Sequence, residues 1–464
     1  MNVVPLTAPG PDPAHRARRQ PPDSAGPART PGRLPGVDVL RALAILGMVW
    51  AHFVVNGWLS PASPEQPPSA ALSWVDGLLG TRSREIFFLL AGLSAALMTG
   101  GFQGYAGRAR SQALKRLAVR AVVLFVLALV LGWTGNWDVQ ILHYYALWLL
   151  LLLPLSLLRA RTLLVLAGLL AVAAPAFKIA ADHAGTAWPF LPATVDLSSM
   201  PRQLHGGFAL LVHPGDWWPT LQHVVFGMTA TEGQDTVSVL PFLVLGLALG
   251  KLDLHSRAVR RRLLAVGAGT AVATVLVSLL AMYPLGAAQA VDDYRDPPPI
   301  AAPAAPGAPG ADADGPPELP PLPKAPWQEL VTMGHPGPAE KTLSATEGVT
   351  VLGLIAALLG GLLTLLDKPL ARRLLHPVTA FGSMALTWYF AHLIVLGWFH
   401  GTPGPEGYPP GRSALSFAVF VAVALAVSVL WRRFFRRGPL EWLTHRVIVA
   451  AVPGRRDGGA AHGR

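Results

Sequence analysis

The sequence predicts an all-α fold, a polytopic transmembrane bundle of about ten helices with both termini in the cytoplasm. The first observation is composition, because 52% of the 464 residues are hydrophobic and only 14% are charged. The second is that the apolar residues gather in long runs. The third is that the loops on alternate sides of these runs differ in charge. Together these features exclude an ordinary soluble enzyme.

The apolar runs are long enough, or nearly so, to cross a hydrocarbon core that needs about 20 helical residues. They lie at 37–56, 83–99, 117–133, 141–158, 162–178, 236–250, 263–283, 347–366, 379–398 and 413–431. The fifth and sixth are the weakest, because Pro175 shortens one and Pro241 interrupts the other. A buried or broken helix is the alternative at both places.

The distribution of charge predicts the orientation. If the N-terminus is cytoplasmic and the runs alternate, the inner side holds 29 of the 37 Lys and Arg residues but 7 of the 26 Asp and Glu residues. This is the positive-inside pattern of a multi-pass protein of the cell membrane. The net charge of +11 therefore indicates the lipid bilayer as a partner, and not nucleic acid.

The chain divides into five parts on composition. They are a disordered cytoplasmic arm at 1–36, a membrane bundle of seven helices at 37–283 with an outer cap at 179–235, a Pro-rich outer loop at 284–346, a membrane bundle of three helices at 347–431, and a basic cytoplasmic tail at 432–464. The arm has no apolar core of the kind that a signal peptide needs. The Pro-rich composition of the loop does not suit a packed domain.

Ionisable residues within apolar helices are functional candidates, because a charge at a helix centre costs roughly 3 kcal/mol to insert. The first helix carries Asp38 and Arg41 near its inner end and His52 towards its outer end. Arg41 and His52 are separated by about 16 Å along the helix and by only about 20° around its axis. The alternatives are an interfacial ion pair between Asp38 and Arg41, and an interhelical hydrogen bond from His52.

The second helix begins with Arg82, Arg84 and Glu85 at its outer end. Arginine is rare on the outer side in this topology, and its guanidinium group suits a carboxylate or a phosphate. The alternative is an ion pair in the region of Arg84 and Glu85 at the membrane surface.

Two further helices place polar groups at a similar depth. The fourth begins with Asp138, His143 and Tyr145, and the ninth carries His392 in its outer half. The sequence has no compact set of metal ligands, so we predict no metal. It also has no cysteine, which leaves neutral imidazole as the suitable general base for a transfer reaction near neutral pH.

Several short motifs are familiar in this order and at these membrane positions. They are DxxR at 38–41, GM at 47–48, RS at 82–83, LAG at 90–92, ILHYYA at 141–146 and ALTxY at 385–389. Together they resemble the bacterial relatives of heparan-alpha-glucosaminide N-acetyltransferase, in the multi-pass membrane acyltransferase superfamily. The spacing of Arg41 and His52 is also similar to that in the first helix of membrane acyltransferases that O-acetylate surface polysaccharides.

The resemblance implies transfer of an acetyl group from cytoplasmic acetyl-CoA to a sugar or glycan acceptor at the outer face. It implies that His52 is the base or the transient acetyl carrier. Together with the ionisable residues described above, this predicts His52, Asp138, His143 and His392 for catalysis, Asp38, Arg41 and Arg116 for the donor, and Arg82, Arg84, Glu85 and Tyr145 for the acceptor. The chain departs from the family pattern at Ala42, where relatives commonly have glycine, and in the loop at 56–81, which has no histidine.

Two other functions fit the same residues. A small-solute transporter or exporter would use the intramembrane histidines to bind a solute or protons. A non-catalytic membrane scaffold would use the cap and the Pro-rich loop to bind partners. The sequence leaves open the acceptor, O- against N-acetylation, direct against two-step transfer, and whether the protein forms an oligomer.

Overall fold

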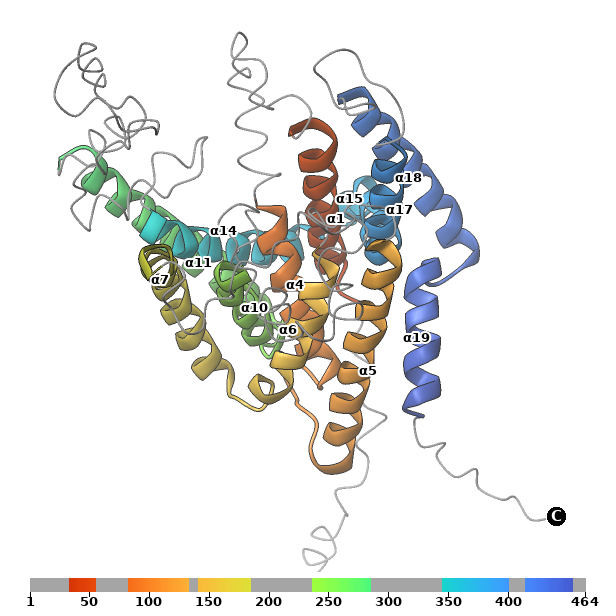
Figure 1. Cartoon of the computed structure of the whole chain (residues 1–464), viewed down its shortest axis with the longest axis horizontal. Coiled ribbons are helices and arrows are strands. Elements are labelled where there is room, and N and C mark those ends of the chain that lie inside the picture. Colours follow the sequence, from red (N-terminus) through yellow and green to blue (C-terminus); the bar gives the residue numbers. More distant parts are fainter. Residues whose placement is uncertain are drawn as a thin grey trace, which may run out of the picture. The chain divides into compact units, whose positions relative to one another are not determined.

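The computed structural model describes residues 33–55, 82–132, 141–184, 236–284, 344–399 and 414–453. Every element in these ranges is helical (Figure 1). In chain order they are α1 (Pro35–Trp50), the π-helical turn η2 (Ala51–Val55), α4 (Ser83–Met98), α5 (Gly107–Gly132), α6 (Leu142–Leu155), α7 (Ala160–Ala184), α10 (Thr236–Gly250), α11 (Arg257–Met282), α14 (Ser344–Leu365), α15 (Pro369–Leu374), α16 (His376–Gly382), α17 (Ala385–Phe399), α18 (Ala414–Phe434) and α19 (Pro439–Ala451). Nearly all of the expected arm, most of the expected cap and Pro-rich loop, and Asp138 lie outside the described residues.

Each apolar run that the sequence predicts contains a helix, and α10 has the expected bounds. Two expectations about proline are wrong, because α7 continues past Pro175 and α10 continues through Pro241. Pro241 is the sixth residue of α10, so the hydrogen bond it removes is to a carbonyl at the very start of the helix. The alternative of a buried helix holds for α10, since nearly every residue from Val239 to its end is buried.

In the described part of the chain, four helices are long and apolar enough to cross a membrane. They are Pro35–Val54, Arg257–Ala281, Thr346–Leu365 and Ala414–Phe434. The pair α16 and α17 would add a fifth span, but it is bent by 78° at the break between the two helices. The apolar parts of α6, α7 and α10 are shorter than the roughly 20 residues of a full span.

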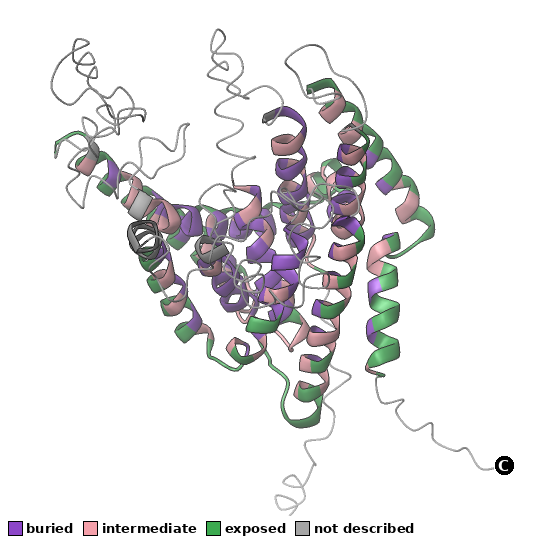
Figure 2. Cartoon of the chain, viewed as in Figure 1, coloured by how far each residue is buried: buried purple, intermediate pink, exposed green. Residues whose placement is uncertain are grey.

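The centre of the bundle is formed by α1, α4 and α10, which carry mostly buried residues (Figure 2). α4 and α10 approach each other closely at two glycines. A Cβ atom on Gly92 would collide with the backbone of Leu243, and one on Gly246 would collide with the backbone of Leu89. Close backbone contact at small residues is typical of helix packing in membranes, where apolar side chains gain little by leaving lipid.

The outward face of α5 is apolar. Val122, Val126 and Val130 lie on one face at intervals of four residues, and each is more than half exposed. The opposite face is buried, as at Leu124 and Leu131. A continuous exposed stripe of this kind is unfavourable in water and is the expected surface of a helix in contact with lipid.

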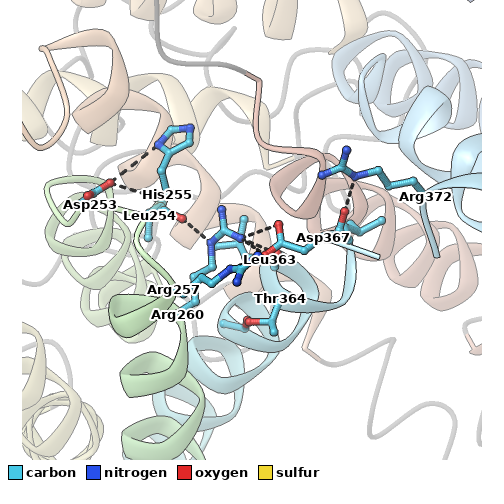
Figure 3. Close-up of polar contacts among 11 residues, drawn as sticks. Asp253, Leu254, His255, Arg257, Arg260, Leu363, Thr364, Asp367 and Arg372 are labelled. Carbon is cyan, nitrogen blue, oxygen red and sulfur yellow. Dashed lines mark hydrogen bonds and ion pairs between the residues drawn. The ribbon is translucent and has the colours of Figure 1, made fainter. Parts of the chain in front are cut away.

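A buried arginine joins the start of α11 to the end of α14 (Figure 3). The Nη1 atom of Arg260 lies 2.9 Å from both carboxylate oxygens of Asp367 and also donates to the carbonyl of Leu363 at 3.0 Å. Its Nε atom donates to the carbonyl of Leu254 at 2.6 Å. Every one of these partners belongs to the fold, so we assign Arg260 a structural role.

The bend before α17 is stabilised by α19, a helix within the expected basic tail. The Oε1 atom of Glu441 accepts from the backbone N–H groups of Leu386 and Thr387 at 2.7 and 3.2 Å. Its Oε2 atom accepts from the Thr387 hydroxyl at 2.6 Å. A carboxylate at the N-terminus of a helix satisfies free N–H groups and complements the helix dipole. Glu441 therefore caps α17 from another helix.

Candidate functional site

Two histidines from distant parts of the chain meet at the end of the first helix. His52 lies on the π-helical turn η2, and His392 lies on α17. The Nδ1 atom of His52 is 3.2 Å from the Nε2 atom of His392, and the rings are stacked with their centroids 5.4 Å apart. His392 is fully buried, whereas His52 is half-buried. Of the two imidazoles, His52 is therefore the one that a substrate can reach.

The hydrogen bonds determine which nitrogen of each ring carries a proton. The Nδ1 atom of His392 is 3.3 Å from the backbone carbonyl of Trp388, which can only accept. In neutral His392 the proton is then on Nδ1, and Nε2 is the acceptor. His52 must therefore donate from its own Nδ1, and its Nε2 is left as the basic nitrogen. In this arrangement His392 fixes the tautomer of His52.

An aromatic cluster lies beside the histidine pair. The Tyr389 ring packs edge-on against His392 at 5.3 Å and stacks on Phe87 of α4 at 5.7 Å, and Phe87 in turn contacts Tyr145 of α6 at 4.9 Å. The buried hydroxyl of Tyr389 accepts a hydrogen bond of 3.0 Å from the backbone N–H of Ile141. Tyr389 was not among the predicted site residues, although it is the last residue of the ALTxY motif.

The charged residues at the start of α4 are already paired within the protein. Arg82 forms an ion pair of 2.6 Å with Glu347 at the start of α14, and Arg84 lies 3.7 Å from Glu85. The alternative of an interfacial ion pair thus holds for Arg84 and Glu85, and Arg82 has a partner that the sequence did not indicate. Oε2 of Glu85 is buried and accepts no hydrogen bond from the described residues. Glu85 is therefore the member of this group that retains acceptor capacity.

At the other end of α1, the expected ion pair is present. The Nη1 atom of Arg41 donates to Asp38 at 2.9 Å, and its Nη2 atom donates to the Ser94 hydroxyl of α4 at 3.1 Å. Asp38 is buried, and about a third of the Arg41 side chain is exposed. Arg41 therefore both anchors α1 to α4 and retains an accessible face.

Two other predicted residues lie on α5 and α6. Arg116 lies on α5 and donates from Nε to the carbonyl of Val452 at 3.4 Å. Nearby, the pKa of His445 on α19 is lowered from its usual 6.5 by partial burial and by the charges of Arg437 and Arg116. His143 is buried on α6, and its ring contacts Tyr144 at 3.9 Å.

Among the residues that the structure describes, no group of three or more His, Cys, Asp or Glu side chains is placed to hold a metal ion.

The chain was compared with families of known proteins. Residues 33–283, more than half of its length, match the family "Heparan-alpha-glucosaminide N-acetyltransferase, catalytic". The chain belongs to this family. Residues 325–451 match a second family, described as a protein of unknown function (DUF418). His52 lies in the region of the acetyltransferase family and His392 in that of the second family, so the histidine pair joins the two regions.

Two curated proteins are similar to short parts of the chain. One is the uncharacterized protein YxaH of Bacillus subtilis (strain 168), 40% identical over 83 residues, which are 17% of this chain and 20% of that protein. The other is an uncharacterized 39.9 kDa protein from the amylase 3' region of Bacillus acidopullulyticus. It is 34% identical over 100 residues, which are 21% of this chain and 28% of that protein. The matches span less than a third of either relative.

Proposed function

We propose that the protein is a multi-pass cell-membrane acetyltransferase that moves an acetyl group from cytoplasmic acetyl-CoA to a sugar or glycan acceptor at the outer face. The observation that carries the proposal is the hydrogen-bonded pair of His52 and His392. Membership of the acetyltransferase family and the apolar helices support it. In the proposed topology about ten helices cross the membrane and both termini are cytoplasmic.

In the proposed mechanism, Nε2 of His52 accepts the proton of the acceptor group as that group attacks the thioester carbonyl. The carbon–sulfur bond then breaks, the acetyl group is on the acceptor, and the thiolate of CoA receives a proton. His392 holds the imidazole of His52 in the required tautomer by accepting from its Nδ1 atom. Tyr389 packs against His392 and restricts its ring, and Phe87 stacks on Tyr389 from the other helix.

The ends of α1 suit different parts of this reaction. Arg41 and His52 are eleven residues apart, which is about 16 Å along a helix. A donor with phosphates at one end and a thioester at the end of a long arm could contact both residues. In this proposal Glu85, on the neighbouring helix, accepts a hydrogen bond from the acceptor sugar, which is supported by the lack of a hydrogen-bond partner for its Oε2 atom among the described residues.

The test is release of CoA from acetyl-CoA by purified full-length protein, with glucosamine as the acceptor probe. We expect His52→Gln to reduce turnover by about 10² to 10⁴, the usual contribution of a general base. His392→Gln should lower turnover less and alter its pH profile, because it removes the orienting partner. His255→Gln is the matched control, since His255 is exposed and pairs with Asp253 away from the site.

Transfer by His52→Gln within a few-fold of the wild type would remove His52 from the mechanism. His143→Gln, measured in parallel, asks whether the second predicted histidine takes part. Flux of glucosamine into proteoliposomes without release of CoA would instead support the transporter function.

A further inference from the structure

Arg120 is an arginine within an apolar helix that has no carboxylate partner among the described residues. It lies on α5, and its Nη1 atom donates to the thioether sulfur of Met98 at 3.4 Å. Its Nε atom is buried and makes no hydrogen bond in the described part of the chain. A thioether is a weak acceptor, and a buried guanidinium N–H without a partner is costly. Arg260, by comparison, has all of its partners within the fold.

The position of Arg120 relates it to Arg41. Met98, which Arg120 contacts, follows Ser94 by one turn on α4, and Ser94 is the residue that Arg41 contacts. Residues four apart lie on the same face of a helix, about 6 Å apart along its axis. Two arginines, from α1 and α5, therefore reach the same face of α4 at its C-terminal end. Arg41 forms an ion pair with Asp38, whereas Arg120 has no carboxylate partner among the described residues, so the two arginines bring an excess positive charge to this face.

We propose that Arg120 binds a phosphate group, with Arg41 one turn further along α4 as the second cation of the same site. Given the proposed function, on which this step rests, the phosphate belongs to the acetyl-CoA donor. A guanidinium group presents several N–H donors to phosphate oxygens, and the bound anion would supply the partner that Nε of Arg120 lacks. The same α1 helix leads from Arg41 to His52, so phosphate and thioester would be bound along one helix.

The direct test is calorimetric binding of CoA to the full-length protein in detergent, because CoA binds without turnover. Arg120→Met keeps an unbranched apolar stem and removes the charge and the N–H donors. It should weaken CoA binding about tenfold or more, the effect of losing a hydrogen bond to a charged group. The matched control is Arg108→Met, an exposed arginine at the start of the same helix, which should bind CoA within about twofold of wild type.

A second variant separates a loss of CoA binding from a folding defect. Met98→Glu places a carboxylate beside Arg120, which should preserve or raise thermal stability while it competes with the phosphate. We expect this variant to bind CoA and inorganic pyrophosphate more weakly than the wild type. A stable Met98→Glu protein with wild-type CoA affinity would overturn the proposal, as would equal losses in Arg108→Met and Arg120→Met.

The outcomes separate this proposal from the function on which it rests. If the wild type transfers acetyl groups and Arg120→Met binds CoA normally, the phosphate site is wrong and the function stands. If CoA binding depends on Arg120 but no acetyl transfer occurs, the site stands and the function fails. A third outcome is that nanodiscs with anionic lipid stabilise the wild type but not Met98→Glu, while CoA stabilises neither protein. The bound phosphate is then that of a lipid headgroup, and its assignment to acetyl-CoA is overturned.

Discussion

Replacing Glu441 tests whether α19 holds α17 in place. In Glu441→Ala the two backbone N–H groups of Leu386 and Thr387 lose their acceptor, while the Thr387 hydroxyl can rotate towards a different acceptor. A helix cap contributes about 1 kcal/mol and a hydrogen bond to a charged group about 1.5–3 kcal/mol, so we expect a loss of about 3 kcal/mol in the free energy of unfolding. Glu441→Gln keeps an amide oxygen for both N–H groups and should cost only about 1 kcal/mol.

The assay is unfolding of the detergent-solubilised protein, followed by tryptophan fluorescence, together with acetyl transfer. His392 follows Thr387 by five residues on α17, so a loosened start of the helix should also reduce turnover at saturating acceptor. Arg446→Ala is the control, because Arg446 lies on the same helix and packs over the ring of Trp442. Equal stability of Glu441→Ala and Arg446→Ala would refute the capping role.

Three further outcomes are expected. In intact cells an impermeant maleimide should react with a cysteine at Gly310 but not with one at Gly458. The chain has no other cysteine, so the labelling reports on the introduced residue alone. Labelling at Gly458 would reject the topology. Arg260→Met should lower the free energy of unfolding by about 2 kcal/mol, because the buried guanidinium group loses its hydrogen bonds to two backbone carbonyls and to Asp367. Exposed Arg261→Met should have little effect, and equal effects would argue against the structural role. The pKa of His445 is lowered in the folded protein, so the unfolded chain binds more protons as pH falls below 6.5 and the folded state loses stability in acid. His445→Gln should therefore flatten the dependence of the melting temperature on pH between about 7 and 5. An unchanged slope would exclude His445 as the source of this pH dependence.

Most helices could be predicted from the sequence because their signal is local. The apolar runs give the positions of α1, α4, α10 and α18 to within a few residues. α19 had a local signal that was missed, since Gly438 precedes it, Pro439 is its first residue and Glu441 lies in its first turn. The break between α16 and α17 likewise occurs at a small residue, Ser383, in an otherwise apolar run.

The candidate site was predictable only in part. Ionisable residues in apolar helices stand out in a sequence, which is why His52, His392 and Arg41 were identified. Contacts between distant helices were not identified, because no local pattern indicates that Glu347 pairs with Arg82 or that His52 meets His392. Arg120 has no sequence signal that separates it from the other basic residues of the inner side; its contact with Met98 and its buried Nε atom distinguish it in the structure.

His52 lies on the π-helical turn that follows α1, so the direction of its imidazole depends on the number of residues between Arg41 and His52. Around an α-helix, each residue adds about 100° of rotation and 1.5 Å of rise. Deleting one residue between Arg41 and His52 would therefore turn the imidazole away from His392 without changing either side chain. Insertions and deletions in this segment should be far less tolerated during evolution than substitutions to other apolar residues. In a relative whose first helix has a different length, the corresponding histidine has to be sought by its position in space, and not by its distance along the chain.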